Sequence, residues 1–408
     1  MWDGLQRYVE SESDALGLLL LLSVSPLSPL STIEELKNRG LYSYLPGIEK
    51  ILDGDFGKGI SERMKEVLNA AVISDREGSK KPLDKLYDRI ISNISTQLEL
   101  MDYNLSQVYQ FVSIFITLIP SILFSTVVFT NPDASIILLK AISFFSLISS
   151  FLGMAIFPWE MRIPSPSYKV FFILFIIIGL YKFFSLLNLD NPMMLSLSMT
   201  SLPLMILSIK YYRFWKRILD DVSKKLEKAS TCIWNIFECI GVDEPERLLD
   251  IQCFGISKAV MTSLYLFGMY GLEELSSELS KLSKMYNDYI NSFSNLRKKT
   301  RVMLFYSVLE VSVSAVIYVF LLHTLSYFSS IDVLQGVPIV IPTKNFLVDL
   351  RNIIDFILSL NSVSLSILTS TVREGNPMYF GIYLFFVCNA VYISYTLSSI
   401  FVTGLLGV

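Results

Sequence analysis

The residues able to do acid–base, nucleophilic or metal chemistry are few in this chain. His323 is the only histidine, and the four cysteines are Cys232, Cys239, Cys253 and Cys388. A lone imidazole cannot complete a zinc site of the Cys/His type, so we expect no metal, no cofactor and no catalytic centre. Three of the cysteines fall in residues 210–301, where we expect reduced thiols that are buried as small hydrophobic side chains. A disulfide is the less favoured alternative.

One glycine-rich stretch invites comparison with a phosphate-binding loop. It reads Gly54-Asp-Phe-Gly57-Lys58-Gly59 and lacks the spacing G-x-x-x-x-G-K-[ST]. We therefore predict a turn between helices, because glycine tolerates the positive φ that such turns use. With no nucleotide loop, we do not expect an enzyme.

Two further features are candidates for function. Glu310 is the single acid deep within an apolar stretch, where a carboxylate is costly and functional by default. It is only about two and a half helical turns from Arg301, so we favour a structural polar contact over a coupling role. Lys224, Lys225 and Lys228 form a basic cluster on one predicted helix. They are either a contact for a partner protein or a solvated helix face.

The elements that must position these residues are membrane helices. Of the 408 residues, 52% are hydrophobic and 17% are charged, and the mean hydropathy is +0.52. Soluble domains carry about a quarter charged residues, and the charges here concentrate in residues 1–107 and 210–301. The net charge of −3 also excludes a nucleic-acid binder driven by bulk positive charge. The composition predicts an all-α integral membrane protein with two water-facing modules.

A helix needs about 20 apolar residues to cross about 30 Å of hydrocarbon. We predict about six transmembrane helices, four in residues 108–212 and two in residues 302–408. Pro203 weakens the fourth of them. The apolar run Leu16–Val24 is too short to span and is predicted to be buried in the first module. The predicted spans are Val108–Thr130, Ile136–Phe157, Tyr168–Leu187, Met193–Tyr212, Val302–Phe328 and Met378–Val402.

Basic residues that flank membrane spans stay in the cytoplasm. Clusters such as Arg297-Lys-Lys-Thr-Arg301 therefore place both modules, and both termini, in the cytosol of a multi-pass protein of the cytoplasmic membrane. Residues 329–377 become the only sizeable outer segment. Its amphipathic stretch Phe346–Ile357 is expected to lie in the membrane interface or on the protein's own spans, with a partner helix as the alternative.

Both water-facing modules, residues 1–107 and 213–301, are predicted to be helical bundles. Apolar residues recur at helical spacing, as in Leu83, Leu86 and Ile90. Each module is long enough to bury a core of its own.

Two cytosolic helical bundles that alternate with membrane helices form a plan similar to the type II secretion F-domain family. These are the membrane platform proteins of type IV pili, archaella and related secretion systems. The extra spans between the bundles resemble the archaeal and tight-adherence branches. The stretch Thr371-Val-Arg-Glu-Gly-Asn-Pro-Met-Tyr-Phe-Gly381 is similar to the charged, glycine-containing element before the final helix of archaeal members.

The resemblance implies a non-enzymatic platform for filament assembly or secretion. Its cytosolic bundles would bind a separate hexameric ATPase of the secretion type, and its spans would guide pilin-like subunits through the lipid bilayer. It also implies that the protein forms a homo-oligomer and does not bind nucleic acid. Under this reading, the candidate contact for the ATPase is the cluster of Lys224, Lys225 and Lys228.

Two other classes of function remain open. One is a transporter or channel for a lipid or solute, and the other is a membrane scaffold unrelated to filaments. Ion-coupled transporters usually carry several acids or broken helices at mid-membrane. The sequence shows one deep acid, Glu310, which argues against transport.

Overall fold

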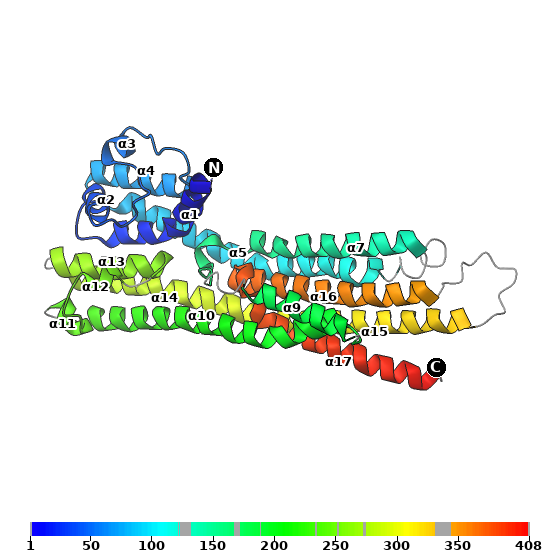
Figure 1. Ribbon diagram of the computed structural model, residues 1–408. Coiled ribbons are helices and arrows are strands. Elements are labelled where there is room, and N and C mark those ends of the chain that lie inside the picture. Colours follow the sequence, from blue (N-terminus) through cyan, green and yellow to red (C-terminus); the bar gives the residue numbers. More distant parts are fainter. Residues whose placement is uncertain are drawn as a thin grey trace. The chain divides into compact units, whose positions relative to one another are not determined.

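The computed structural model consists of helices joined by turns, and none of its described residues forms a strand. The described residues are 2–120, 122, 132–166, 172–187, 189–232, 235–250, 253–271, 275–330 and 344–406. They confirm the all-α prediction (Figure 1). The chain divides into two compact units. Unit 1 comprises Met1–Leu100, Pro158–Pro164 and Phe214–Leu296, and unit 2 comprises Met101–Phe157, Ser165–Arg213 and Arg297–Val408.

Unit 1 contains most of the charged helices. Its helices are α1 (Trp2–Val24), α2 (Pro29–Asn38), α3 (Ile48–Leu52), α4 (Glu62–Glu77), α11 (Ile236–Ile240), α12 (Arg247–Asp250), α13 (Gly255–Tyr270), nearly all of α14 (Leu275–Lys299), and parts of α5 (Lys81–Ser113) and α10 (Pro192–Ser230).

Unit 1 has one core that both predicted modules share. The leucines of α1, from Leu16 to Leu22, are fully buried as expected, and α1 packs on α13. Their backbones approach closely, because a Cβ atom added at Gly17 would lie 2.8 Å from the carbonyl oxygen of Gly255. The prediction of two bundles with separate cores therefore differs from the structure. The first module covers its leucine run with a helix from the second.

Polar contacts also join the two segments of unit 1. Tyr44 donates a hydrogen bond of 3.1 Å to Asp14 on α1, and Lys258 Nζ on α13 lies 3.6 Å from the same carboxylate oxygen. Lys281 on α14 forms a 2.6 Å ion pair with Asp84 on α5. These contacts tie residues near the start of the chain to residues that follow α10.

Unit 2 contains the apolar helices. They are α7 (Pro132–Ser149), α8 (Gly153–Ile156), α9 (Phe172–Leu186), α15 (Val302–Ser330), α16 (Lys344–Glu374), α17 (Phe380–Leu406) and the remaining parts of α5 and α10.

Five helical segments among the described residues are long and apolar enough to cross a membrane. They confirm a multi-pass membrane protein but not the count of about six spans. Part of the predicted span Val108–Thr130 lies outside the described residues, and Tyr168–Leu187 is represented by the shorter α9. The five segments are Ile136–Ile156, Pro192–Ser230, Ser277–Tyr327, Phe346–Glu374 and Pro377–Leu405.

The helix at the fourth predicted span is unbroken. Helix α10 continues without a break through Pro203 as far as Ser230. Membrane helices tolerate an internal proline because neighbouring groups satisfy the backbone carbonyl that it frees.

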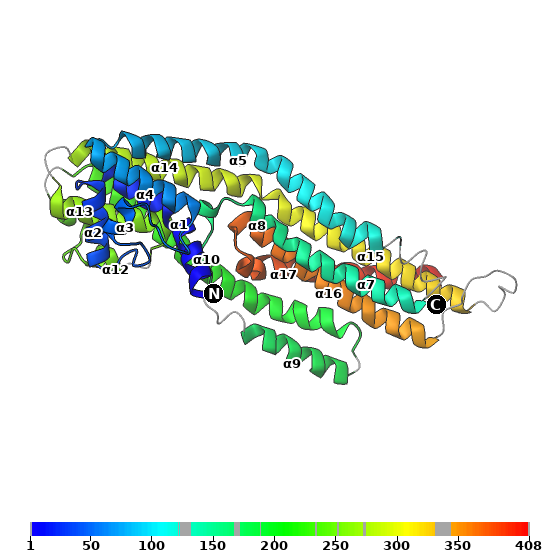
Figure 2. The same cartoon turned by 90° about the horizontal axis from the view of Figure 1, so that it is seen from above.

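Helix α16 lies within the expected outer segment at residues 329–377, and it is itself long and apolar enough to cross a membrane. It is a helix of 31 residues whose apolar stretch is mostly buried among other helices of unit 2, notably α7, α15 and α17 (Figure 2). An outer helix lying in the interface would keep one face uncovered. Its serines and threonines lower its hydropathy, but a helix enclosed by protein does not need an apolar surface towards lipid.

The disulfide corrects the expectation of reduced thiols in residues 210–301. Cys232 and Cys239 are joined, whereas Cys253 is free and buried as expected, and Cys388 is also free and buried. The stretch from Gly54 to Gly59 forms the predicted turn, with φ of +75° at Gly54, +74° at Gly57 and +91° at Gly59.

Candidate functional site

A buried glutamate stands where four helices of unit 2 meet. Glu374 is the last residue of α16, and Gly375 follows with a φ of +67°, which a side chain would strain. Asn376 then caps the next turn, because its side chain accepts a hydrogen bond from the backbone N–H of Met378. This sharp reversal starts α17 beside the end of α16.

The Glu374 carboxylate is held by groups from two other helices. Arg297 Nη2, near the end of α14, lies 3.0 Å from one of its oxygens. The hydroxyl of Tyr383, in the first turn of α17, lies 2.6 Å and 2.7 Å from the two oxygens and donates its proton between them. Arg297 also donates to the hydroxyl of Tyr212 on α10, and its guanidinium lies 4.3 Å from the centre of that ring. We call Tyr212, Arg297, Glu374 and Tyr383 the Glu374 cluster.

The two charges of this cluster differ in their access to water. The side chain of Glu374 is 0% exposed, whereas that of Arg297 is 27% exposed. An ionised carboxylate without solvent is stable only when it is paired and hydrogen-bonded. Arg297 and Tyr383 supply both interactions, so the cluster can hold one buried negative charge at a helix junction.

A second polar group caps a helix at the other end of unit 2. The two carboxylate oxygens of Asp355, a buried residue on α16, accept hydrogen bonds of 2.8 Å and 2.9 Å from the backbone N–H groups of Met193 and Met194. These groups begin α10, where the helix dipole favours a negative charge. One turn before Asp355, Arg351 forms a 2.9 Å ion pair with Asp190.

The distance between these two sites along α16 is close to the thickness of the hydrocarbon core of a membrane. Asp355 and Glu374 are 19 positions apart on one helix, which corresponds to about 28 Å. The hydrocarbon core of a bilayer is about 30 Å thick. No residue between Asp355 and Arg373 is charged. The charged groups of α16 therefore bracket a stretch of the length that a span requires.

None of the residues singled out in the sequence bonds to Glu374 or to Asp355 in the interactions described above. Glu310 is half-buried on α15, about 13 Å along the helix axis from Arg301. His323 Nε2 lies 3.4 Å from the hydroxyl of Ser399 on α17. A polar contact at Glu310 and its alternative of a coupling role both stay predictions.

The lysine cluster lies on the part of α10 that belongs to unit 1. Lys224 and Lys228 are exposed, whereas Lys225 Nζ forms a 2.8 Å ion pair with Asp221. Of the three lysines, Lys224 and Lys228 are therefore the better candidates for contact with a partner, because Lys225 is already paired within the helix.

Sequence reasoning missed Glu374, Asp355 and Arg297 as a set. Glu374 appears in the stretch from Thr371 to Gly381, whose residues as far as Pro377 fall in the predicted outer segment. The available indication was the uncharged stretch of α16, which has Asp355 before it and Arg373-Glu374-Gly375 after it. Arg297 was counted only as one of several flanking cations.

The described residues contain no group of three or more His, Cys, Asp or Glu side chains that could hold a metal ion. No protein-family model, no curated protein and no solved structure matches the chain.

Proposed function

We propose that the chain is a membrane platform protein for assembly of a type IV pilus-like filament or a related secretion system. In this role unit 1 faces the cytosol and binds a separate hexameric ATPase, and unit 2 guides pilin-like subunits in the membrane. The observation that carries the proposal is the continuity of the helices. The helices α5, α10 and α14 each contain residues of both units.

Continuous helices are suited to mechanical coupling. Helix α10 has 39 residues and passes from unit 2 to unit 1 between Arg213 and Phe214. Helix α14 passes from unit 1 to unit 2 between Leu296 and Arg297 and is followed almost directly by α15. A helix is stiff along its axis because every turn is hydrogen-bonded to the next. A displacement of unit 1 would therefore act on the first residues of unit 2.

Two members of the Glu374 cluster lie at the boundary between the units. Tyr212 and Arg297 are within two positions of the boundary on α10 and α14, and both belong to the cluster. Movement of either helix would stretch or release the bonds to Glu374, which joins α16 to α17. Networks of hydrogen bonds and ion pairs can switch between discrete arrangements, and such networks can couple distant sites of a protein.

The binding of the ATPase supplies the experiment. Exposed Lys224 and Lys228 are candidates for reversible electrostatic contact with a motor, since such contacts are polar at the rim of an interface. We expect the double variant Lys224→Glu and Lys228→Glu to weaken co-purification with the secretion-type ATPase of the same cell. The amount of protein in the membrane should be unchanged.

The matched control is the double variant Lys81→Glu and Lys85→Glu, which reverses two exposed lysines on α5. It should leave ATPase binding intact. Unchanged, salt-insensitive binding by the α10 variant would defeat the assignment of Lys224 and Lys228. Loss of the gene without any effect on filaments or secretion would defeat the platform function.

A transporter or channel for a lipid or solute is the second candidate, and α16 is the observation that favours it. Asn361 is 1% exposed, and neither its amide oxygen nor its amide nitrogen has a hydrogen-bond partner. Unpartnered polar groups inside a span are costly and commonly mark a solute path. Solute flux in vesicles containing the purified protein, abolished by Asn361→Leu, would support transport over the platform.

A further inference from the structure

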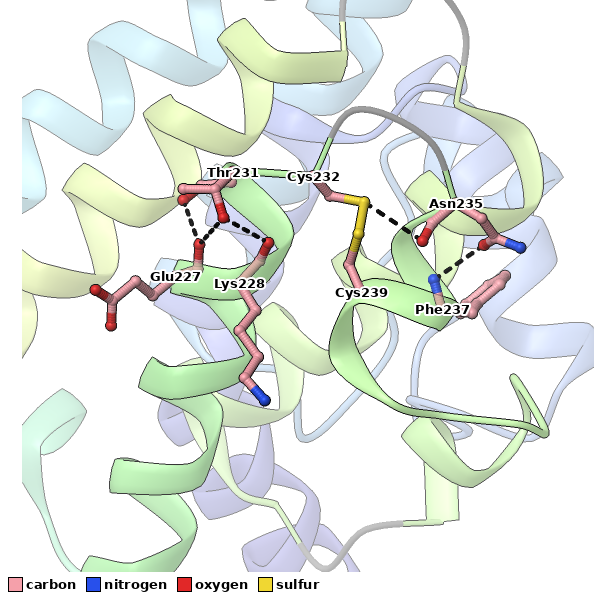
Figure 3. The surroundings of a disulfide bond; sticks show 8 residues. Glu227, Lys228, Thr231, Cys232, Asn235, Phe237 and Cys239 are labelled. Carbon is pink, nitrogen blue, oxygen red and sulfur yellow. Dashed lines mark hydrogen bonds between the residues drawn. A yellow bond between two sulfur atoms is a disulfide. The ribbon is translucent and has the colours of Figure 1, made fainter.

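The one disulfide of the described chain lies at a turn of unit 1. It joins Cys232, two residues after the end of α10, to Cys239 in α11 (Figure 3). The two Cα atoms are 6.0 Å apart, which is within the usual range for a bridged pair. Both cysteines are only half-buried, so part of each residue is open to solvent.

The other two cysteines have a different environment. Cys253 and Cys388 are buried, and burial raises the pKa of the Cys253 thiol to about 12. Thiol exchange requires a thiolate and access to it. The accessible sulfur atoms of the described chain are therefore those of Cys232 and Cys239.

Whether this disulfide persists depends on the redox state of the compartment that contains unit 1. The basic residues at the end of α14, together with Arg301 just before α15, predict that unit 1 is cytosolic. In the cytosol, dithiol proteins such as thioredoxin keep most protein thiols reduced. Disulfides in cytosolic proteins are commonly transient or redox-sensing. We propose that Cys232 and Cys239 form a reversible thiol–disulfide site whose reaction partner is a dithiol reductant protein.

The dithiol reductant alone supplies the electrons and protons that this exchange requires. A thiolate of the reductant attacks the sulfur of one of the two cysteines, the bond between Cys232 and Cys239 breaks, and the other cysteine leaves as a thiolate. The second thiolate of the reductant then displaces the first cysteine from the mixed disulfide. The chain gains two electrons and two protons, and the reductant becomes a disulfide.

The structure indicates which part responds to reduction. Helix α11 keeps an apolar anchor without the disulfide, because Ile236 and Ile240 are buried and Phe237 lies against Gly268. A Cβ atom at Gly268 would be 2.2 Å from the Phe237 ring. Reduction would therefore leave α11 in place and release Cys232 from it. Cys232 follows Thr231, which donates a 3.0 Å hydrogen bond to the Lys228 carbonyl near the end of α10 (Figure 3).

Differential alkylation of the full-length protein in native membranes tests the site. Free thiols are blocked under denaturing conditions, and any disulfide is then reduced with dithiothreitol and tagged with a polymer-linked maleimide. After the membranes are treated with diamide, we expect two tags for each chain. After later incubation with reduced thioredoxin, we expect none. The double variant Cys253→Ser and Cys388→Ser should respond in the same way, and Cys232→Ser should give no tag.

Every other result overturns the proposal. If no tag appears after diamide, the two cysteines do not bridge. If two tags persist after incubation with thioredoxin, the bridge is a permanent structural disulfide. Reduction by glutathione but not by thioredoxin would overturn the choice of a dithiol protein as partner. None of these results depends on whether the chain assembles filaments.

Discussion

Arg297 and Glu374 share one ion pair, but their replacement has unequal consequences. Arg297→Gln would leave a carboxylate that is 0% exposed without its countercharge. Breaking a buried pair in this way costs about 3–5 kcal/mol. Glu374→Gln would leave a guanidinium that is 27% exposed and retains contact with water. We therefore expect Arg297→Gln to lower the free energy of unfolding more than Glu374→Gln, as measured by denaturant unfolding in detergent micelles.

The double variant is the control for this prediction. The double variant that combines Arg297→Gln and Glu374→Gln removes both charges, so neither charge is left buried without its partner. Residues in contact are not additive in their effects on stability. The loss in the double variant should be smaller than the sum of the two single losses. Equal single losses that add without coupling would contradict the role given to the pair.

Asp14 makes the stability of unit 1 depend on pH. Burial raises the pKa of this carboxyl above its usual value of 3.8, despite the nearby Lys258 and the Tyr44 hydroxyl. The folded protein therefore binds this proton more tightly than the unfolded chain. The stabilisation from Asp14 is fully present below pH 3.8 and is lost as the pH rises through the raised pKa.

The variant Asp14→Asn keeps the shape of the side chain but cannot titrate. The stability of the wild-type protein relative to this variant should fall with rising pH across that window and then level off. Thermal unfolding of both proteins in the same detergent across a pH series measures the difference. A difference that increases with pH would mean that Lys258 and Tyr44 outweigh burial.

The sequence was informative about individual helices where hydropathy and proline position decide the structure. The burial of Leu16–Val24, the glycine turn from Gly54 to Gly59 and most of the apolar helices followed from local pattern. Helix α16 did not, because its serines and threonines read as polar. Their hydroxyls are satisfied within the helix, as when Ser362 and Ser366 bond to carbonyl oxygens one turn earlier. That arrangement depends on enclosure by other helices, which the sequence does not show.

Close packing of α17 on α10 depends on one glycine. A Cβ atom at Gly381 would lie 2.5 Å from Leu204 Cγ and 3.0 Å from the Leu204 carbonyl oxygen. Small residues permit this approach of membrane helices. Gly381→Ala should therefore lower the free energy of unfolding by about 1–3 kcal/mol, as overpacked cores do. Gly404 is the matched control, because it lies on the same helix and has no atom within 4 Å of the added Cβ. Gly404→Ala should be neutral or slightly stabilising, and equal losses from the two variants would contradict the close approach.

The sequence predicted two charged segments and an apolar remainder, and the division into two compact units largely follows that pattern. It did not predict that the two charged segments share one core. That core depends on contacts between residues more than 200 positions apart, such as Gly17 with Gly255 and Asp14 with Lys258. The Glu374 cluster has the same origin, since Arg297 and Glu374 are 77 positions apart. Periodicity reports one helix at a time and cannot identify its partners.

The direction of the helices in unit 2 changes the predicted position of the C-terminus. Arg297 and Glu374 meet, so the start of α15 and the end of α16 lie at the same end of unit 2. Tyr383 bonds to Glu374, so α17 begins at that end as well. The basic residues Lys298, Lys299 and Arg301 lie close in the chain to Arg297 and predict that this end is cytosolic. Helix α17 has 27 residues and is therefore about 40 Å long, which exceeds the thickness of the hydrocarbon core.

We therefore expect the C-terminus on the outer face of the membrane, opposite to the expectation from sequence that both termini are cytosolic. A C-terminal fusion to alkaline phosphatase, which is active only outside the cytosol, should be active. A C-terminal fusion to a fluorescent protein that matures only in the cytosol should be dark. Fusions after Lys299 serve as the control and should give the reverse pattern, because that residue ends α14 on the cytosolic side. A fluorescent C-terminal fusion together with a fluorescent Lys299 fusion would mean that α16 does not cross the membrane. In that case the ion pair between Arg297 and Glu374 would not join two spans.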